Sequence, residues 1–262
     1  TFTVTGNSAI NRVLVASSTL GTTRTITAAT VTVNAADFRD ITGAGAGSWN
    51  LSGASNYSGD CGGNSGITFT VAADRFRVGG TGSWSATTEW ASTSGGAGST
   101  RVLLPQDNCF FDANSFSAGS QTVTLDMPRA GKSIDWTGAT GTPTWDKSIT
   151  TRLHGSLTLI SGMSISGVQV LVLEGRGAYT LTCAGQTLAF QLTISMVGGT
   201  LTNQDAFLSS AAVSHNNGTW SLNNFSALAL SYASSSGATA VLTLGNATFT
   251  LTGTGNTFFV LN

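Results

Sequence analysis

Hydrophobic and polar residues alternate in short runs along almost the whole chain, and Gly, Asn, Asp or Ser residues separate the runs. Alternation with a period of two is typical of β-strands that bury one side, and no segment sustains the period of an amphipathic helix. The pattern therefore predicts an all-β protein with little helix. The clearest runs cover residues 12–16, 23–33 with a break at 28–29, 66–71, 121–125, 168–174, 187–195, 227–232 and 258–261.

A glycine followed by a strand-like run recurs in the C-terminal part of the chain at intervals of about 20 to 27 residues, the period expected of stacked structural repeats. The chain thus predicts a β-solenoid, in which each turn buries its apolar residues against neighbouring turns. The phrases are Gly155-Ser-Leu-Thr-Leu, Gly177-Ala-Tyr-Thr-Leu-Thr, Gly199-Thr-Leu-Thr, Gly218-Thr-Trp-Ser-Leu and Gly245-Asn-Ala-Thr-Phe-Thr-Leu-Thr.

Two Gly/Ser-rich stretches, 42–65 and 92–100, interrupt the strand pattern. The first is long enough to be a surface loop or a joint between two blocks. We therefore expect a smaller N-terminal β block over residues 1–74, followed by a capped, right-handed parallel β-helix over 75–262.

The segment 78–116 resembles a sequence found in tailed-phage virion proteins and bacterial surface adhesins. Its characteristic parts are a tryptophan pair, a Gly-rich stretch, a Pro-x-x-Asp-like turn and a Phe-Asp-x-x-Ser phrase, here Trp84, Trp90, Ser94-Gly-Gly-Ala-Gly, Pro105-Gln-Asp107-Asn and Phe111-Asp112-Ala-Asn-Ser. In those families the segment stands at the start of a right-handed β-helix. The resemblance implies a virion-surface, cell-surface or extracellular location and a structural or adhesive role. It supplies no catalytic residues.

The physical interpretation of this segment is a cap, because the open end of a solenoid exposes apolar surface and unpaired strand edges. We expect cap or first-turn core positions at Trp84, Trp90, Phe110, Phe111 and Asp112. A less favoured alternative is that exposed aromatic rings stack on glycans, with Trp90 and Trp220 as the candidates.

Charged residues make up only 9% of the chain, against about 25% in a typical globular protein. The formal net charge is −1 and no run of basic residues occurs, so the sequence argues against a nucleic-acid partner. No stretch approaches the roughly 20 apolar residues that a membrane-spanning helix requires. The abundance of Ser, Thr, Asn and Gly instead suits an extracellular β-rich protein.

Some carboxylates have the spacing of adjacent solenoid turns that a glycosidase needs: Asp107 with Asp126, Asp126 with Asp146, and Asp112 with Asp135. Turn aspartates usually cap local backbone donors, and we favour that role here. The Thr-x-Thr pairs, among them Thr180-Leu-Thr182, do not recur at a constant period, so we interpret them as ordinary strand alternation rather than an ice-binding array.

The basic residues Arg129, Lys147, Arg152 and His154 are interpreted as solvated turn charges, and neither His154 nor His215 has metal-ligand spacing. The sequence predicts no metal, cofactor or catalytic residue. The cysteines form no Cys-x-x-Cys pair, and Cys61, Cys109 and Cys183 allow one disulfide, such as Cys61 with Cys109, or none.

These observations predict a structural or adhesive subunit of a virion appendage or extracellular fibre rather than an enzyme. Its expected partners are further copies of itself or other fibre subunits, because residues 1–5 and 258–261 look like strands able to continue a sheet, and a cell-surface glycan is a possible receptor. The alternative is a β-helix that binds or depolymerises polysaccharide.

Overall fold

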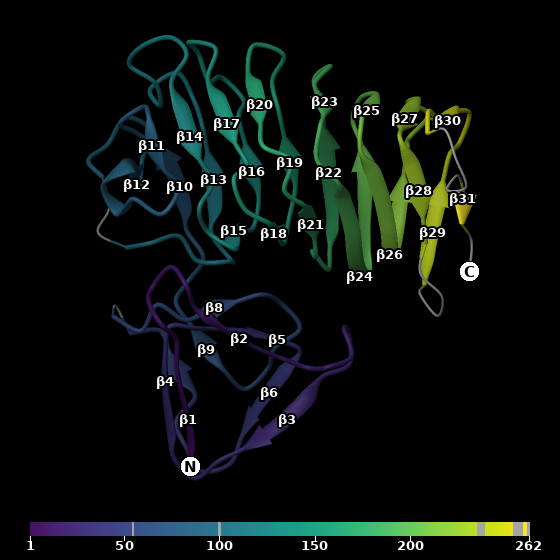
Figure 1. Ribbon diagram of the computed structural model, residues 1–262. Coiled ribbons are helices and arrows are strands. Elements are labelled where there is room, and N and C mark those ends of the chain that lie inside the picture. The colour runs from purple at the N-terminus through teal and green to yellow at the C-terminus, as the bar shows by residue number, and fades with distance from the viewer. Residues whose placement is uncertain (54, 99–100, 235–238, 254–258, 261–262) are drawn as a thin grey trace.

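The computed structural model describes residues 1–53, 55–98, 101–234, 239–253 and 259–260. Its strands stack in parallel into a β-solenoid of about 11 turns, with a single 3-10 helix among the described residues. The predicted all-β solenoid is therefore confirmed. Figure 1 shows two stacks whose axes cross: the N-terminal one is seen end-on as a triangle beneath the side of the longer one.

The N-terminal unit has three-sided turns built from short parallel strands. Its ladders are β1 (Phe2–Thr5) with β4 (Val31–Asn34); β2 (Val13–Ala16) with β5 (Ala36–Arg39) and β8 (Gly59–Asp60); β3 (Arg24–Thr27) with β6 (Ile41–Ala44); and β7 (Asn50–Leu51) with β9 (Thr68–Phe69). Phe38, Trp49 and Leu51 are central to its separate apolar core.

The longer unit also has three faces, each named here by its first strand. The β10 face contains β10 (Asp74–Arg77), β13 (Asn108–Phe110), β16 (Ile134–Asp135), β19 (Leu157–Thr158), β22 (Ala178–Thr182), the C-terminal halves of β24 (Leu192–Asn203) and β26 (Ala212–Ser221), and β29 (Ala240–Thr243).

The other two faces complete each turn. The β11 face contains β11 (Gly82–Ser83), β14 (Thr122–Thr124), β17 (Thr144–Asp146) and β20 (Ser164–Ser166), followed by the ladder β23 (Thr187–Leu188), β25 (Phe207–Ser209), β27 (Ala227–Ala229) and β30 (Phe249–Leu251). The β15 face contains β15 (Arg129–Gly131), β18 (Thr151–Leu153), β21 (Leu171–Leu173), the N-terminal halves of β24 and β26, β28 (Ser231–Ala233) and β31 (Phe259–Val260).

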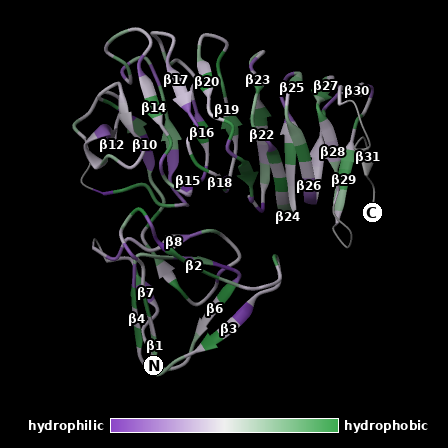
Figure 2. Cartoon of the chain, viewed as in Figure 1, coloured by the Kyte–Doolittle hydropathy of each residue, from purple (hydrophilic) through white to green (hydrophobic). Residues whose placement is uncertain are grey.

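The interior of the longer unit is filled by inward-pointing apolar residues that stack between turns. Ile134, Leu157 and Leu181 are register partners on three successive strands of the β10 face, and all are fully buried. Figure 2 shows hydrophobic residues alternating with more polar ones along the strands. This period-two burial is the physical basis of the pattern visible in the sequence.

Four of the five repeated glycine phrases stack on the β10 face, where Gly177, Gly199 and Gly218 begin strand segments in successive turns. The phrase at Gly245 is displaced: its strand, β30, lies on the β11 face. Of the run predicted at 258–261, residues 259–260 form β31, and residues 258 and 261 lie outside the described part of the chain.

The first turn of the longer unit is covered by an antiparallel segment. The 3-10 helix η1 (Thr87–Glu89) leads into β12 (Trp90–Ala91), which pairs antiparallel with β10. This pairing ends the parallel ladder and leaves β10 with no open edge at Phe76 and Arg77.

Candidate functional site

Charged side chains concentrate where the N-terminal unit meets the longer unit. Eight of the 23 charged residues in the chain form ion pairs there, although the chain is poor in charge overall. The acidic members Asp37, Asp40 and Glu174 contact Arg12, Arg129, Arg176, Arg39 and Arg152. We call this set of eight residues the joint network.

The geometry of stacked turns creates one side of this network. Arg129 on β15 and Arg152 on β18 are register partners in adjacent turns, so parallel pairing holds the two guanidinium groups on one edge of the solenoid. Glu174 follows β21, the next strand of the same face. Across the joint, strand β5 supplies Asp37 and Arg39.

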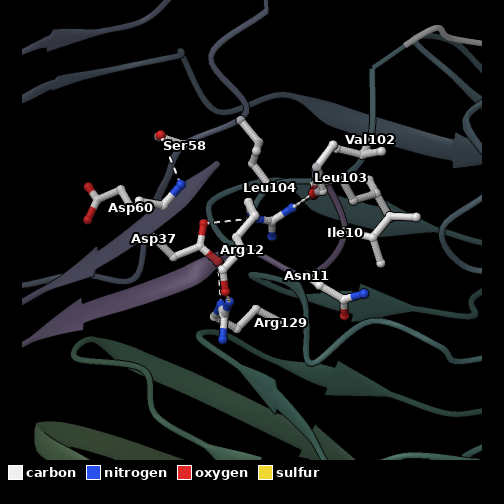
Figure 3. Close-up of polar contacts among 12 residues, drawn as sticks. Ile10, Asn11, Arg12, Asp37, Ser58, Asp60, Val102, Leu103, Leu104 and Arg129 are labelled. Atoms are coloured by element: carbon white, nitrogen blue, oxygen red, sulfur yellow. Dashed lines mark hydrogen bonds and ion pairs between the residues drawn. The ribbon is translucent and has the colours of Figure 1, made fainter. Parts of the chain in front are cut away.

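Asp37 has no exposed surface. Its Oδ1 accepts a hydrogen bond of 2.7 Å from Nε of Arg12, and its Oδ2 accepts one from Nε of Arg129. Figure 3 shows Arg12 extending from Asp37 towards the backbone of Leu103, to which its Nη1 donates at 3.2 Å. One carboxylate thus holds two buried cations from different parts of the chain.

Glu174 and Asp40 form the remaining ion pairs. The two carboxylate oxygens of Glu174 are divided between Arg152 and Arg39, the latter at 3.0 Å. Asp40 has a positive φ of 60°, a conformation that turns the chain between β5 and β6, and its Oδ2 accepts a hydrogen bond of 2.6 Å from Arg176. The two units are therefore joined by paired, oriented charges.

A cavity of about 190 Å³ lies beside the network, between the two units. The N-terminal unit contributes Asp60, Cys61 and Gly62, and the connecting segments contribute Ala72, Pro105 and Gln106. The longer unit contributes Lys132, His154, Glu174, Gly175, Arg176 and Tyr179. Both units must therefore be in place to form the cavity.

His154 and Cys61 are uncharged at neutral pH in this setting. Burial lowers the pKa of His154 to about 4, an effect that Glu174 and Asp37 partly oppose. Burial, together with the nearby Asp37 carboxylate, raises the pKa of the Cys61 thiol well above its usual value. Cys61 is therefore a poor nucleophile, whereas His154 has one donor and one acceptor nitrogen.

The sequence-based interpretation of four basic residues as solvated turn charges is corrected by these positions. Arg129 and His154 are each 7% exposed and Lys147 is fully buried, while Arg152 is half-buried in its pair with Glu174. Sequence reasoning missed the joint network because its members are dispersed between residues 12 and 176. The available signal was the rarity of charge, which makes each charged residue a candidate for a specific contact.

The aromatic residues predicted to form a cap lie in or beside the first turn. Trp84, Trp90 and Phe111 have no exposed surface, and the rings of Trp84 and Trp90 meet edge to face at a centroid distance of 5.0 Å. Phe110 stacks on Phe76 at 5.2 Å on the half-exposed side of the β10 face.

The residues proposed for glycan stacking are not accessible. Trp90 and Trp220 are both 0% exposed, and their indole nitrogens donate hydrogen bonds to the Trp84 carbonyl and the Asn203 side chain. A sugar ring cannot stack on either indole as they lie here.

The aspartates weighed as catalytic pairs each accept hydrogen bonds from nearby backbone or side-chain groups. Asp112 accepts a hydrogen bond from the backbone of Asn114, Asp135 from that of Thr137, and Asp126 from both the backbone and the hydroxyl of Ser85. Asp107 pairs with Arg101 at 2.7 Å and caps the backbone of Leu104, and Asp146 accepts a hydrogen bond from Ser166. Asp107, Asp112 and Asp135 thus cap backbone groups close in sequence, whereas Asp126 and Asp146 bind serines 41 and 20 residues away in a neighbouring turn.

The three cysteines are buried free thiols. In the described part of the chain, no group of three or more His, Cys, Asp or Glu side chains is placed to hold a metal ion. None of the described helices has the length and apolar character needed to span a membrane.

Outward-pointing hydroxyl groups form regular rows on the C-terminal half of the β10 face. Thr180, Thr202, Ser221 and Thr243 are register partners in four successive turns. Parallel rows pair Thr200 with Thr219 and Thr158 with Thr182. The rows were missed in the sequence because Thr-x-Thr pairs were compared only with one another. In the structure Thr180 is the register partner of Thr202, and Thr182 is the register partner of Thr158.

Comparison with protein-family models, curated proteins and solved structures found no match.

Proposed function

We propose that this chain is a structural and attachment subunit of an extracellular fibre or virion appendage. The observation that carries the proposal is the row of stacked hydroxyl groups formed by Thr180, Thr202, Ser221 and Thr243. Neighbouring turns place equivalent groups about 4.8 Å apart, so the β10 face repeats one weak hydrogen-bonding group along a rigid axis.

Such a surface suits a partner that is itself repetitive. A single hydroxyl contact contributes little, but contacts fixed on one rod add through effective concentration. A surface polysaccharide offers repeated hydroxyl groups and needs no opposite charge, which matches the scarcity of charge on this face. The joint network supports the structural part of the proposal, because it fixes the angle between the two units.

The experiment is a binding assay on immobilised bacterial surface polysaccharides with two matched variants. Thr202→Lys places a long charged side chain in the middle of the hydroxyl row, and Thr144→Lys makes the same change on a half-buried position of the β11 face. We expect Thr202→Lys to abolish binding and Thr144→Lys to retain it.

Two results would contradict the proposal. If the wild-type chain binds none of the polysaccharides, or if both variants bind equally, the β10 face has no attachment role. If incubation instead releases new reducing ends from a polysaccharide, the chain is an enzyme and the structural proposal is wrong.

A further inference from the structure

The cavity at the joint contains polar groups that the rest of the protein leaves unused. Both ring nitrogens of His154 are buried without a hydrogen-bond partner. Among the described residues, the Lys132 ammonium group has no acidic partner and the Tyr179 hydroxyl has no hydrogen-bond partner. Buried polar groups are nearly always paired, so the unpaired imidazole of His154 points to a missing ligand, and the half-exposed Lys132 and Tyr179 line the same cavity.

Other groups in the lining are already occupied, which narrows the choice of ligand. Glu174 is shared by two arginines. Gln106 accepts a hydrogen bond from the backbone of Asp60 and donates one to the carbonyl of Thr70. The groups left for a ligand are the Lys132 cation, the neutral imidazole of His154, the phenol of Tyr179 and the unpaired Nε of Arg176, whose Nη2 is held by Asp40.

The charge around the cavity favours an anion. The joint network contains five arginines and three carboxylates, and the lining adds Lys132 and Asp60. The network and the lining together therefore contain six basic and four acidic residues. This is a surplus of two positive charges in a chain whose net charge is −1. A ligand with a carboxylate would reduce this surplus.

The size of the cavity limits the ligand to a small molecule. A volume of about 190 Å³ would hold roughly six water molecules at their liquid volume. It is below the range of about 300 to 1,000 Å³ that accommodates drug-sized ligands. One sugar ring with its substituents is of suitable size, and a nucleotide is too large.

We propose that the cavity between the two units binds one sugar acid, with Lys132 contacting the carboxylate and Tyr179 and His154 contacting ring hydroxyl groups. This site is separate from the hydroxyl rows and does not depend on the attachment role. A free sugar acid and the terminal sugar acid of a glycan share this chemistry. Comparing the free acid with an oligosaccharide that ends in it distinguishes the two sources.

The test is isothermal titration of the full chain with glucuronate, galacturonate and N-acetylneuraminate, with glucose and acetate as partial ligands. We expect at least one sugar acid to bind with a dissociation constant of about 1 mM or tighter, and glucose and acetate to bind at least tenfold more weakly. Lys132→Met should weaken binding by at least tenfold, as expected for the loss of one charge-assisted hydrogen bond.

Two further variants separate binding from folding. Arg24→Gln removes one positive charge at an exposed position of the N-terminal unit and should bind like the wild type. Ala72→Phe, at an exposed residue on the cavity lining, should fill the cavity and abolish binding while the thermal unfolding midpoint stays near that of the wild type.

The proposal is overturned if no sugar acid binds at about 10 mM, a concentration that would reveal any site of millimolar affinity. It is also overturned if Lys132→Met and Ala72→Phe bind as the wild type does. Loss of binding in Thr202→Lys instead of Lys132→Met would place the sugar on the β10 face.

Discussion

Replacing Asp37 with Asn tests whether the joint network holds the two units together. The change keeps the size of the side chain and a carbonyl acceptor but removes the charge that faces two guanidinium groups. The carboxylate has no exposed surface, and the side chains of Arg12 and Arg129 are 1% and 8% exposed. Because these groups are buried, water cannot solvate the two guanidinium groups that lose their carboxylate partner.

Removing one partner of a buried ion pair typically costs about 3 to 5 kcal/mol, because a buried charge is left uncompensated. Here two cations lose their partner, so we expect the upper part of that range. Total stabilities of domains are about 5 to 15 kcal/mol, so Asp37→Asn removes a large share. The expected decrease in the melting temperature is roughly 10 °C or more.

Chemical denaturation measures the loss, and limited proteolysis shows where it acts. We expect earlier cleavage of the connection at residues 70–73, since the N-terminal unit separates more readily. Asp74→Asn is the matched control, because Asp74 is exposed and accepts a single hydrogen bond from Asn108. That variant should lose no more than about 0.5 kcal/mol.

A second variant separates charge from shape. Adding Arg129→Met to Asp37→Asn removes one of the two uncompensated cations, so the double variant should be more stable than Asp37→Asn alone. If Asp37→Asn lies within about 1 kcal/mol of the Asp74→Asn control, the network does not stabilise the joint and the reasoning is wrong.

Three further changes have expected outcomes. Lys147→Met should raise the free energy of unfolding by about 3 kcal/mol at pH 7, because burial against aromatic rings lowers the pKa of Lys147 to about 8. In the wild type, the free energy of unfolding should rise between pH 8 and 10.5, because Lys147 keeps its proton in the unfolded chain and has lost it in the folded chain. The same rise with pH in Lys147→Met would contradict the assignment. His154→Gln should reduce the loss of stability between pH 6.5 and 4. In this window His154 takes up a proton in the unfolded chain but remains neutral in the folded chain, where its pKa is about 4. If the free energy of unfolding falls equally with decreasing pH in the variant and the wild type, the assignment is wrong. Trp90→Ala should cost about 3 to 5 kcal/mol and expose the edge of β10 to aggregation, measured by denaturation and light scattering, whereas a soluble variant of wild-type stability would show that β12 is no cap.

The sequence by itself determined the class of fold. Alternation along each strand and recurrence of the glycine phrases are local properties, and parallel stacking repeats one turn, so the period seen at Gly177, Gly199 and Gly218 transfers directly into structure. The turn aspartates are similar, because Asp112 and Asp135 bind backbone groups within two residues. Spacing along the chain was therefore sufficient to predict the solenoid period and the capping role of these aspartates.

Only the tertiary structure decided the joint network, the cavity and the hydroxyl rows. Asp37 and Arg129 are 92 residues apart, and their contact requires the N-terminal unit to fold back against one edge of the longer stack. Charges in turns look solvated in a sequence because their burial depends on what packs against the turn. Likewise, Thr202 and Ser221 share a row only because the register of β24 and β26 aligns them. The sequence therefore encodes each turn locally, whereas the sites arise where separate turns and separate units are brought together.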